Sequence, residues 1–193
     1  MKKIYKYLLL VVAIVIIIGT DITSAFALEL TGSGSCGEGI MWELTSDGTL
    51  TISGSGVMSN FFAEDSPWYS KRDDIHSVII SSGVTNIGAN AFFNCSNLLD
   101  VDISDTVTII GAAAFADCTS LTEIRFGSVI DGSIDFHWSP LSKASIENIV
   151  SVLSDDTEDL TVTFGRAHIN SVYEEAEWEQ IVALKPNWVF ALI

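Results

Sequence analysis

The chain has 193 residues, of which 25 are acidic and 9 are basic, so its formal net charge is −16. This length is enough for one domain with a substantial hydrophobic core. The negative charge argues against nucleic acids and anionic lipid headgroups as partners, because both would be repelled.

The first segment, residues 1–27, has the pattern of a secretory signal peptide. Three lysines among its first six residues precede the apolar run Leu8–Ile18, and Ala25–Ala27 matches an A-x-A cleavage site. Cleavage before Leu28 would remove three lysines and one aspartate, so the remaining chain, residues 28–193, would be still more negative. An uncleaved membrane anchor is the alternative, although the apolar run is shorter than the roughly 20 residues that a membrane span requires.

The next segment, residues 36–66, predicts an N-terminal cap built on a β-hairpin. Apolar and polar residues alternate over Ile40–Leu44 and again over Leu50–Ile52, with a Ser-Asp-Gly turn between them. Such a hairpin would protect the edge of a strand stack from aggregation. Leu28–Ser35 predicts a flexible leader, and the G-x-G-x-x-G letters of Gly32–Gly37 lack the flanking strand and helix of a dinucleotide site.

An internal repeat occupies the middle of the chain, residues 67–141. Val78–Asp100 and Val101–Glu123 align without a gap and are identical at twelve of 23 positions. A fixed period of this length indicates a solenoid, in which a copy buries its apolar side only against its neighbours. We therefore predict an α/β-solenoid-like stack of about two full 23-residue repeats with degenerate repeats on both flanks.

Equivalent positions in successive repeats predict columns of side chains in the core. Steps of one full repeat give an aliphatic column of Ile75, Leu98 and Leu121, and an aromatic column of Tyr69, Phe92, Phe115 and Trp138.

Cys95 and Cys118 also share one repeat position, so their Cβ vectors should run parallel, which does not suit a disulfide. We interpret them as small buried hydrophobes and expect Cys36 to be free. A Cys95–Cys118 bridge is the alternative, since secretion would permit it.

The outer face of the repeat strands is the candidate binding surface. If Val78 and Ile80 and their equivalents point into the core, alternation places their neighbours outward. The candidate binding residues are Ile79, Asp102 and Arg125, with Asp100 and Glu123 beside them. The alternative is a solvated sheet face without a partner.

The remainder, residues 142–193, predicts an α/β C-terminal cap. One helical face is apolar over Ile146–Leu153, with Ser142 or Ser145 as its N-cap. A strand over Leu160–Phe164 follows.

Ser171-x-x-Glu174 has the form of a capping box and predicts a helix that extends to about Leu184. A last strand is expected over Trp188–Leu192. Because no Pro/Ser/Gly-rich linker interrupts the chain, residues 28–193 are predicted to form a single domain.

Sequence motifs for catalysis, cofactors or metals are missing. The three histidines (His76, His137 and His168) lack the spacing of a zinc site, and no nucleophile elbow occurs. The acidic clusters Asp155–Asp159 and Glu174–Glu179 lack the EF-hand spacing, so we interpret them as solvated turns and helix starts. We predict no catalytic residue, no cofactor and no metal site.

The repeat pattern V-x-I-x-x-x-V-x-x-I-G-x-x-A-F-x-x-C-x-x-L resembles the BspA-like (Treponema pallidum-type) leucine-rich repeats. Cys36-Gly37, Trp42, Asp47–Gly54 and Ser66–Tyr69 resemble the segment that precedes repeats in this family, and the resemblance covers about residues 33–126.

This resemblance implies a secreted or cell-surface, non-catalytic protein that recognises an extracellular protein or glycan through its repeat surface. Contact with a membrane is expected only if the signal segment is uncleaved. The alternative is an extracellular enzyme, or an enzyme-associated module, with an unrecognised site in the C-terminal extension.

Overall fold

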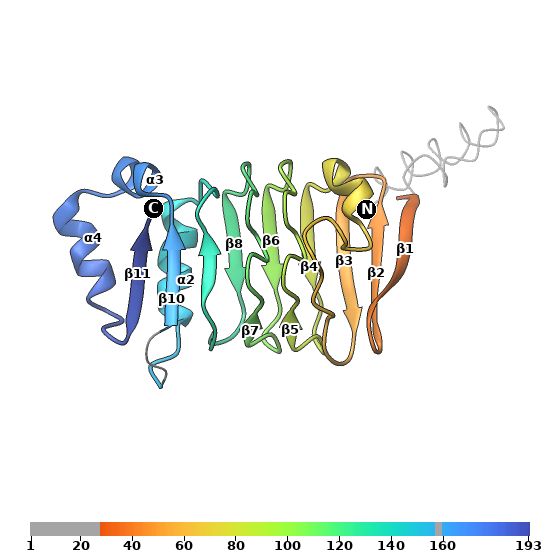
Figure 1. The fold of residues 1–193 in the computed structure, drawn as a ribbon, viewed down its shortest axis with the longest axis horizontal. Coiled ribbons are helices and arrows are strands. Elements are labelled where there is room, and N and C mark those ends of the chain that lie inside the picture. The colour runs from red at the N-terminus through yellow and green to blue at the C-terminus, as the bar shows by residue number, and fades with distance from the viewer. Residues whose placement is uncertain (1–27, 157–159) are drawn as a thin grey trace, which may run out of the picture.

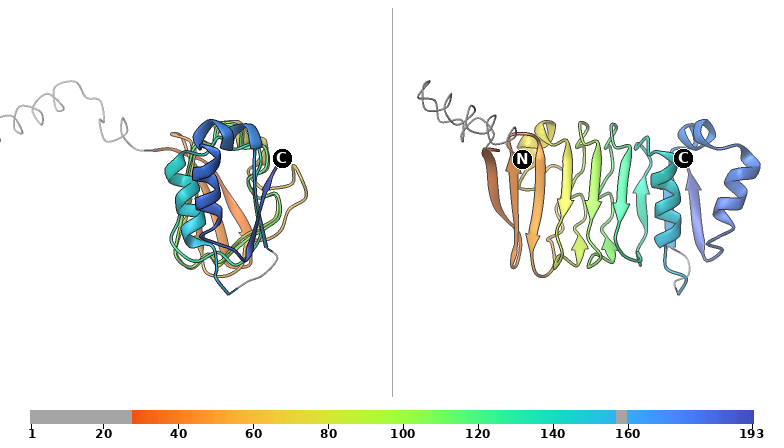
Figure 2. Two further views of the ribbon diagram at one scale, coloured as in Figure 1. Left: turned by 90° about the vertical axis from the view of Figure 1, so that its left-hand side faces the viewer. Right: turned by 180° about the vertical axis from the view of Figure 1, so that it is seen from behind.

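The strands lie side by side along one axis and form an elongated body, with β1 at one end and α4 and β11 at the other (Figures 1 and 2). This computed structural model describes residues 28–156 and 160–193. The predicted signal segment lies outside the described residues, as do Glu158 and Asp159 of the acidic turn.

A six-stranded sheet with the order β1-β2-β3-β4-β6-β8 forms one long face of the body. Three antiparallel strands come first: β1 (Leu30–Gly37), β2 (Ile40–Thr45) and β3 (Thr49–Gly54). Three parallel strands follow, one from each repeat: β4 (Ser77–Ile80), β6 (Asp100–Ile103) and β8 (Glu123–Phe126). Their register pairs equivalent positions of successive repeats, such as Val78, Val101 and Ile124, so the structure confirms the predicted repeat stack.

A second, two-stranded sheet of β5 (Asn86–Ile87) and β7 (Ile109–Ile110) lies on another side of the repeats. The glycine that follows each strand is required by the close approach of the neighbouring layer. A Cβ at Gly88 would overlap the carbonyl oxygen of Ser59, and one at Gly111 would overlap the backbone nitrogen of Ala89. The glycine of the shared Ile-Gly pair is therefore needed because the backbones of neighbouring layers are in contact there.

The core contains a stacked aromatic column that differs at both ends from the predicted one. Phe92 and Phe115 stack with ring centroids 5.4 Å apart, as expected. Trp68 and Phe136, rather than Tyr69 and Trp138, continue the column at 5.6 and 5.9 Å. The prediction was wrong there because the flanking layers differ in length from the two full repeats, so a fixed step lands one or two positions away.

The predicted aliphatic column is confirmed, since Ile75, Leu98 and Leu121 are all fully buried. All three cysteines are buried and free, which agrees with the predicted burial of Cys95 and Cys118 and with a free Cys36. Burial raises the pKa of Cys95 to about 12. The thiol of Cys118 donates to the carbonyl oxygen of Phe92 at 3.2 Å.

The segment predicted as a flexible leader is the edge strand β1. Its glycines accommodate the side chain of Trp42 on the neighbouring strand, because a Cβ at Gly34 would lie 2.9 Å from the indole Nε1. Gly37 is equally constrained, since a Cβ there would overlap the carbonyl oxygen of Val57. The predicted β2–β3 hairpin is present. The 3-10 helix Tyr69–Asp74 lies between this hairpin and the first repeat strand.

The C-terminal region contains a parallel sheet with the order β11-β10-β9, made of β9 (Ile134–Phe136), β10 (Leu160–Phe164) and β11 (Trp188–Leu192). Phe136 and Phe164 continue the aromatic column into this sheet, with ring centroids 6.2 Å apart.

Helix α2 (Lys143–Val152) lies beside β8 and begins at the predicted N-cap, Ser142, whose hydroxyl accepts from Ser145 N at 3.2 Å. Ser145 Oγ accepts from Ile124 N at 3.0 Å, and Asn148 Oδ1 accepts from Phe126 N at 3.1 Å. Side chains of α2 thus accept hydrogen bonds from the backbone N–H groups at the free edge of β8, where another strand would otherwise pair.

The predicted capping box at Ser171–Glu174 is wrong. Helix α3 (Arg166–Val172) has already begun there, and Ser171 Oγ donates to the carbonyl oxygen of His168 at 2.6 Å. The chain is extended at Tyr173, which is buried, and α4 (Glu175–Val182) begins after it without a side-chain cap. Tyr173 therefore enters the core at the break between the two helices.

Candidate functional site

The five sequence-predicted binding residues lie on the outward face of the six-stranded sheet. Ile79, Asp102 and Arg125 are register partners on β4, β6 and β8, and all three are exposed. Asp100 and Glu123 are partners in an adjacent row and are half-buried. The structure therefore brings all five together on one surface, here called the repeat face.

The hairpin extends the repeat face beyond the predicted residues. Thr51 on β3 is the register partner of Ile79, and Glu43 on β2 is the partner of Thr51. One row thus crosses β2, β3, β4, β6 and β8 as Glu43, Thr51, Ile79, Asp102 and Arg125. The alternation of apolar and polar residues that predicts the hairpin also predicts that Glu43 faces outward. The sequence alone was therefore sufficient to place Glu43 on the repeat face.

Charges on the repeat face are only partly paired. Arg125 Nη2 lies 4.0 Å from Asp100 Oδ1, and both side chains are substantially exposed, so this pair contributes little to stability. Asp100 also accepts from Ser77 Oγ at 3.0 Å, whereas Glu123 accepts from Ser145 Oγ at 3.2 Å. Within the described part of the chain, Asp102 forms no ion pair.

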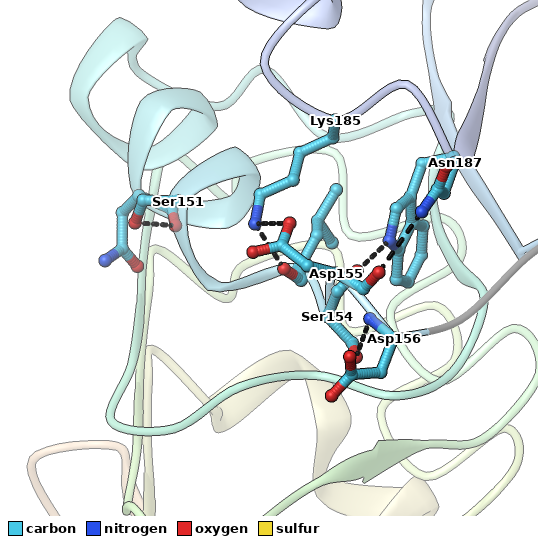
Figure 3. Close-up of polar contacts among 9 residues, drawn as sticks. Ser151, Ser154, Asp155, Asp156, Lys185 and Asn187 are labelled. Atoms are coloured by element: carbon cyan, nitrogen blue, oxygen red, sulfur yellow. Dashed lines mark hydrogen bonds and ion pairs between the residues drawn. The ribbon is translucent and has the colours of Figure 1, made fainter.

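A polar cluster near the C-terminal end of α2 was not predicted (Figure 3). Lys185 Nζ donates to the carbonyl oxygen of Leu153 at 2.6 Å and to Asp155 Oδ1 at 2.7 Å. Trp188 Nε1 donates to the carbonyl oxygen of Ser154 at 2.7 Å, and Asn187 Nδ2 donates to that of Asp155 at 3.1 Å. Carbonyl groups that follow α2 thus accept hydrogen bonds from the turn between α4 and β11 and hold it in place, so the cluster has a structural role.

The acidic cluster Glu174–Glu179 borders a groove of about 520 Å³ formed with Arg166, Tyr173 and Trp178. Glu177 forms an ion pair with Lys143. Burial raises the pKa of Tyr173 to about 12, and the negative charges of Glu147 and Glu177 add to the effect.

Residues 28–156 and 160–193 contain no group of three or more side chains arranged to hold a metal ion. Within the same ranges, every helix is too short or too polar to traverse a lipid bilayer.

Comparison with known proteins identifies the repeats. The family model described as the BspA type leucine rich repeat region matches residues 66–157, in six copies. The crystal structure of a leucine-rich repeat protein from Eubacterium ventriosum is similar at 24% sequence identity and a TM-score of 0.46. The match covers 74% of this chain but only 39% of that protein. No curated protein matches the chain.

Proposed function

Because residues 66–157 match the BspA type leucine rich repeat family model, we propose that the chain is a secreted or cell-surface, non-catalytic binding protein. Its ligand is an extracellular protein or glycan, which it recognises through the repeat face. A protein-binding or adhesion role is what the family suggests, and the repeat face adds the residues that would perform it.

The observation that carries this proposal is the outward row of Glu43, Thr51, Ile79, Asp102 and Arg125. These side chains are held in register by paired strands, so little conformational freedom of the backbone is lost when a partner docks. The row combines an exposed apolar side chain, Ile79, with charges of both signs. Such a surface can supply contact area and orientation together.

The segments at the two ends of the stack would act as caps that cover the first and last repeats. The hairpin β2–β3 with β1 covers the first repeat, and α2 satisfies the edge of β8 through Ser145 and Asn148. Residues 36–66 would then be the N-terminal cap and residues 142–193 the C-terminal cap of a single domain.

Export of the chain would depend on residues 1–27 as a cleaved signal peptide. N-terminal sequencing of protein recovered from the medium should begin at Leu28.

The binding experiment uses the purified protein to capture partners from extracellular material, followed by affinity measurement on each identified partner. Asp102→Lys should weaken binding at least about tenfold, which corresponds to about 1.4 kcal/mol. Asp105→Lys is the matched control, because it reverses the same charge in the same repeat at an exposed position outside the strands. Unchanged affinity in Asp102→Lys for every partner would exclude the repeat face as the site.

The second candidate function is an extracellular enzyme, or an enzyme-associated module, with its site in the C-terminal extension. The groove beside Glu174, Glu175 and Glu179 is the observation that favours it. Turnover of an extracellular substrate that is lost in Glu175→Gln, with folding unchanged, would support the enzyme and argue against a purely binding role.

A further inference from the structure

The three parallel strands of the C-terminal sheet end at one edge, and the segments that follow them line a cleft. His137–Pro140 follow β9, Gly165–His168 follow β10, and Ile193 follows β11. Figure 1 shows β10 and β11 ending beneath α3. The cleft measures about 320 Å³, within the range of small-molecule sites. Ligands of α/β proteins commonly bind outside the carboxyl ends of parallel strands.

Trp138 forms one wall of this cleft and is 57% exposed, whereas Trp42, Trp68 and Trp188 are buried. Its indole stacks on the ring of His137, with centroids 4.2 Å apart and the planes 24° from parallel. The stacked histidine supports the indole from one side. The exposed indole is therefore a positioned apolar platform suited to stacking with a ligand ring.

Ser139 contributes a polar group that the protein itself does not use. The residue is 2% exposed, it lines the cleft, and its hydroxyl has no hydrogen-bond partner among the described residues. An unpaired buried hydroxyl destabilises the folded protein, and a ligand that bonds to it would relieve this cost. Nearby, His168 Nε2 donates to the carbonyl oxygen of Leu141 at 2.7 Å, which fixes the position of the ring.

Arg166 provides an unpaired positive charge. Four other basic side chains of the described ranges form ion pairs, namely Arg72, Arg125, Lys143 and Lys185, but no carboxylate of those ranges lies within 4.0 Å of Arg166. One guanidinium N–H donates to the carbonyl oxygen of Leu192 at 2.7 Å, and the other donors are available. A guanidinium without an ion pair can bind a carboxylate at short range, although the chain's net charge of −16 disfavours anionic ligands at long range.

We propose that this cleft binds a pyranose ring that carries a carboxylate, such as a uronic acid unit of a polysaccharide. The apolar C–H face of the sugar stacks on Trp138, a ring hydroxyl pairs with Ser139, and the carboxylate pairs with Arg166. A flat aromatic acid would also stack and pair with Arg166, but it would leave the Ser139 hydroxyl unpaired. The site is separate from the repeat face and does not depend on the function proposed for that surface.

The test is calorimetric titration of the purified protein with trigalacturonate and with its methyl ester, which keeps the rings but removes the charges. The acid should bind saturably, and the ester at least about tenfold more weakly. Trp138→Ala should abolish binding, and Arg166→Gln should remove the preference for the acid. Phe62→Ala is the control, because Phe62 is 82% exposed and is not part of the cleft.

Ser139→Ala separates a ligand contact from a structural role. If the hydroxyl serves the ligand, the variant binds trigalacturonate several-fold more weakly while its melting temperature is unchanged or higher. Equal affinity for the acid and the ester, undiminished binding in Trp138→Ala, or binding of benzoate without trigalacturonate would overturn the proposal. Asp102→Lys should bind trigalacturonate normally, so failure at the repeat face and failure here are distinguishable.

Discussion

The repeat stack and the C-terminal region extend the same core by different means. Between repeats, backbone lies against backbone: β4, β6 and β8 pair in register, and Gly88 and Gly111 allow the closest approach. Beyond β8, side chains of α2 replace the next strand, yet the aromatic column continues through Phe136 and Phe164. A periodic sequence is therefore required where successive layers have the same backbone geometry. Beyond β8 the geometry changes, and the chain only has to supply large side chains that continue to fill the core.

The largest expected effect tests backbone contact in the stack. Gly111→Ala places a Cβ against the backbone of Ala89 and should destabilise the protein by about 3 kcal/mol or more, because neither backbone segment can move without separating the layers. Gly132→Ala is the matched control, since the nearest atom to its Cβ would be 3.8 Å away. Urea unfolding monitored by circular dichroism measures both, and similar losses would contradict the comparison.

The next prediction concerns the helix that replaces a strand. Ser145→Ala removes the acceptor of the buried Ile124 N–H, and should cost about 1–2 kcal/mol. Ser151→Ala on the same helix removes an exposed hydroxyl that bonds only to the carbonyl of Asn148, so it should stay within about 0.5 kcal/mol. If the two variants unfold at the same urea concentration, α2 does not stabilise the edge of β8.

The contrast between the two regions also explains what could be predicted from the sequence. The repeat strands, the aliphatic column and the burial of Cys95 and Cys118 follow from one period, because each layer repeats the surroundings of the last. The period fails at Trp68 and Phe136, where layer lengths change. The capping box at Ser171 was misleading because burial of Tyr173 outweighed a local hydrogen-bond preference.

The two candidate sites also differ in how far they could be predicted from the sequence. Alternation along β4, β6 and β8 was sufficient to place Ile79, Asp102 and Arg125 on one face. The cleft at Trp138, Ser139 and Arg166 gave no such signal, because its residues come from the ends of strands that are separated by helices in the sequence. Only the parallel order of β9, β10 and β11 brings them together.

A third prediction uses the buried thiols of the stack. Burial raises the pKa of Cys95 to about 12 from an ordinary value of 9.0, so the folded protein keeps a proton that the unfolded chain loses as the pH rises above 9. Stability should therefore be fully present below pH 9 and fall between about pH 9 and 12, by about 1 kcal/mol for this thiol at pH 10. Urea unfolding at pH 8 and pH 10 measures the loss, and Cys95→Ala should reduce it. An equal loss in the variant would mean that the thiol does not contribute.

The smallest effect distinguishes one repeat from the next. Asn90 and Ala113 occupy the same repeat position and both have positive φ angles, of 53° and 55°. Asparagine tolerates this left-handed conformation, whereas alanine is strained there because its Cβ approaches the following carbonyl oxygen. Ala113→Asn should therefore raise stability by about 0.5–1 kcal/mol. Asn90→Ala should lower it by more, because it also removes the hydrogen bond from Nδ2 to the carbonyl of Phe61. The two melting temperatures should move in opposite directions; a decrease in both would mean that packing against the neighbouring layer, rather than backbone conformation, determines the residue at this position.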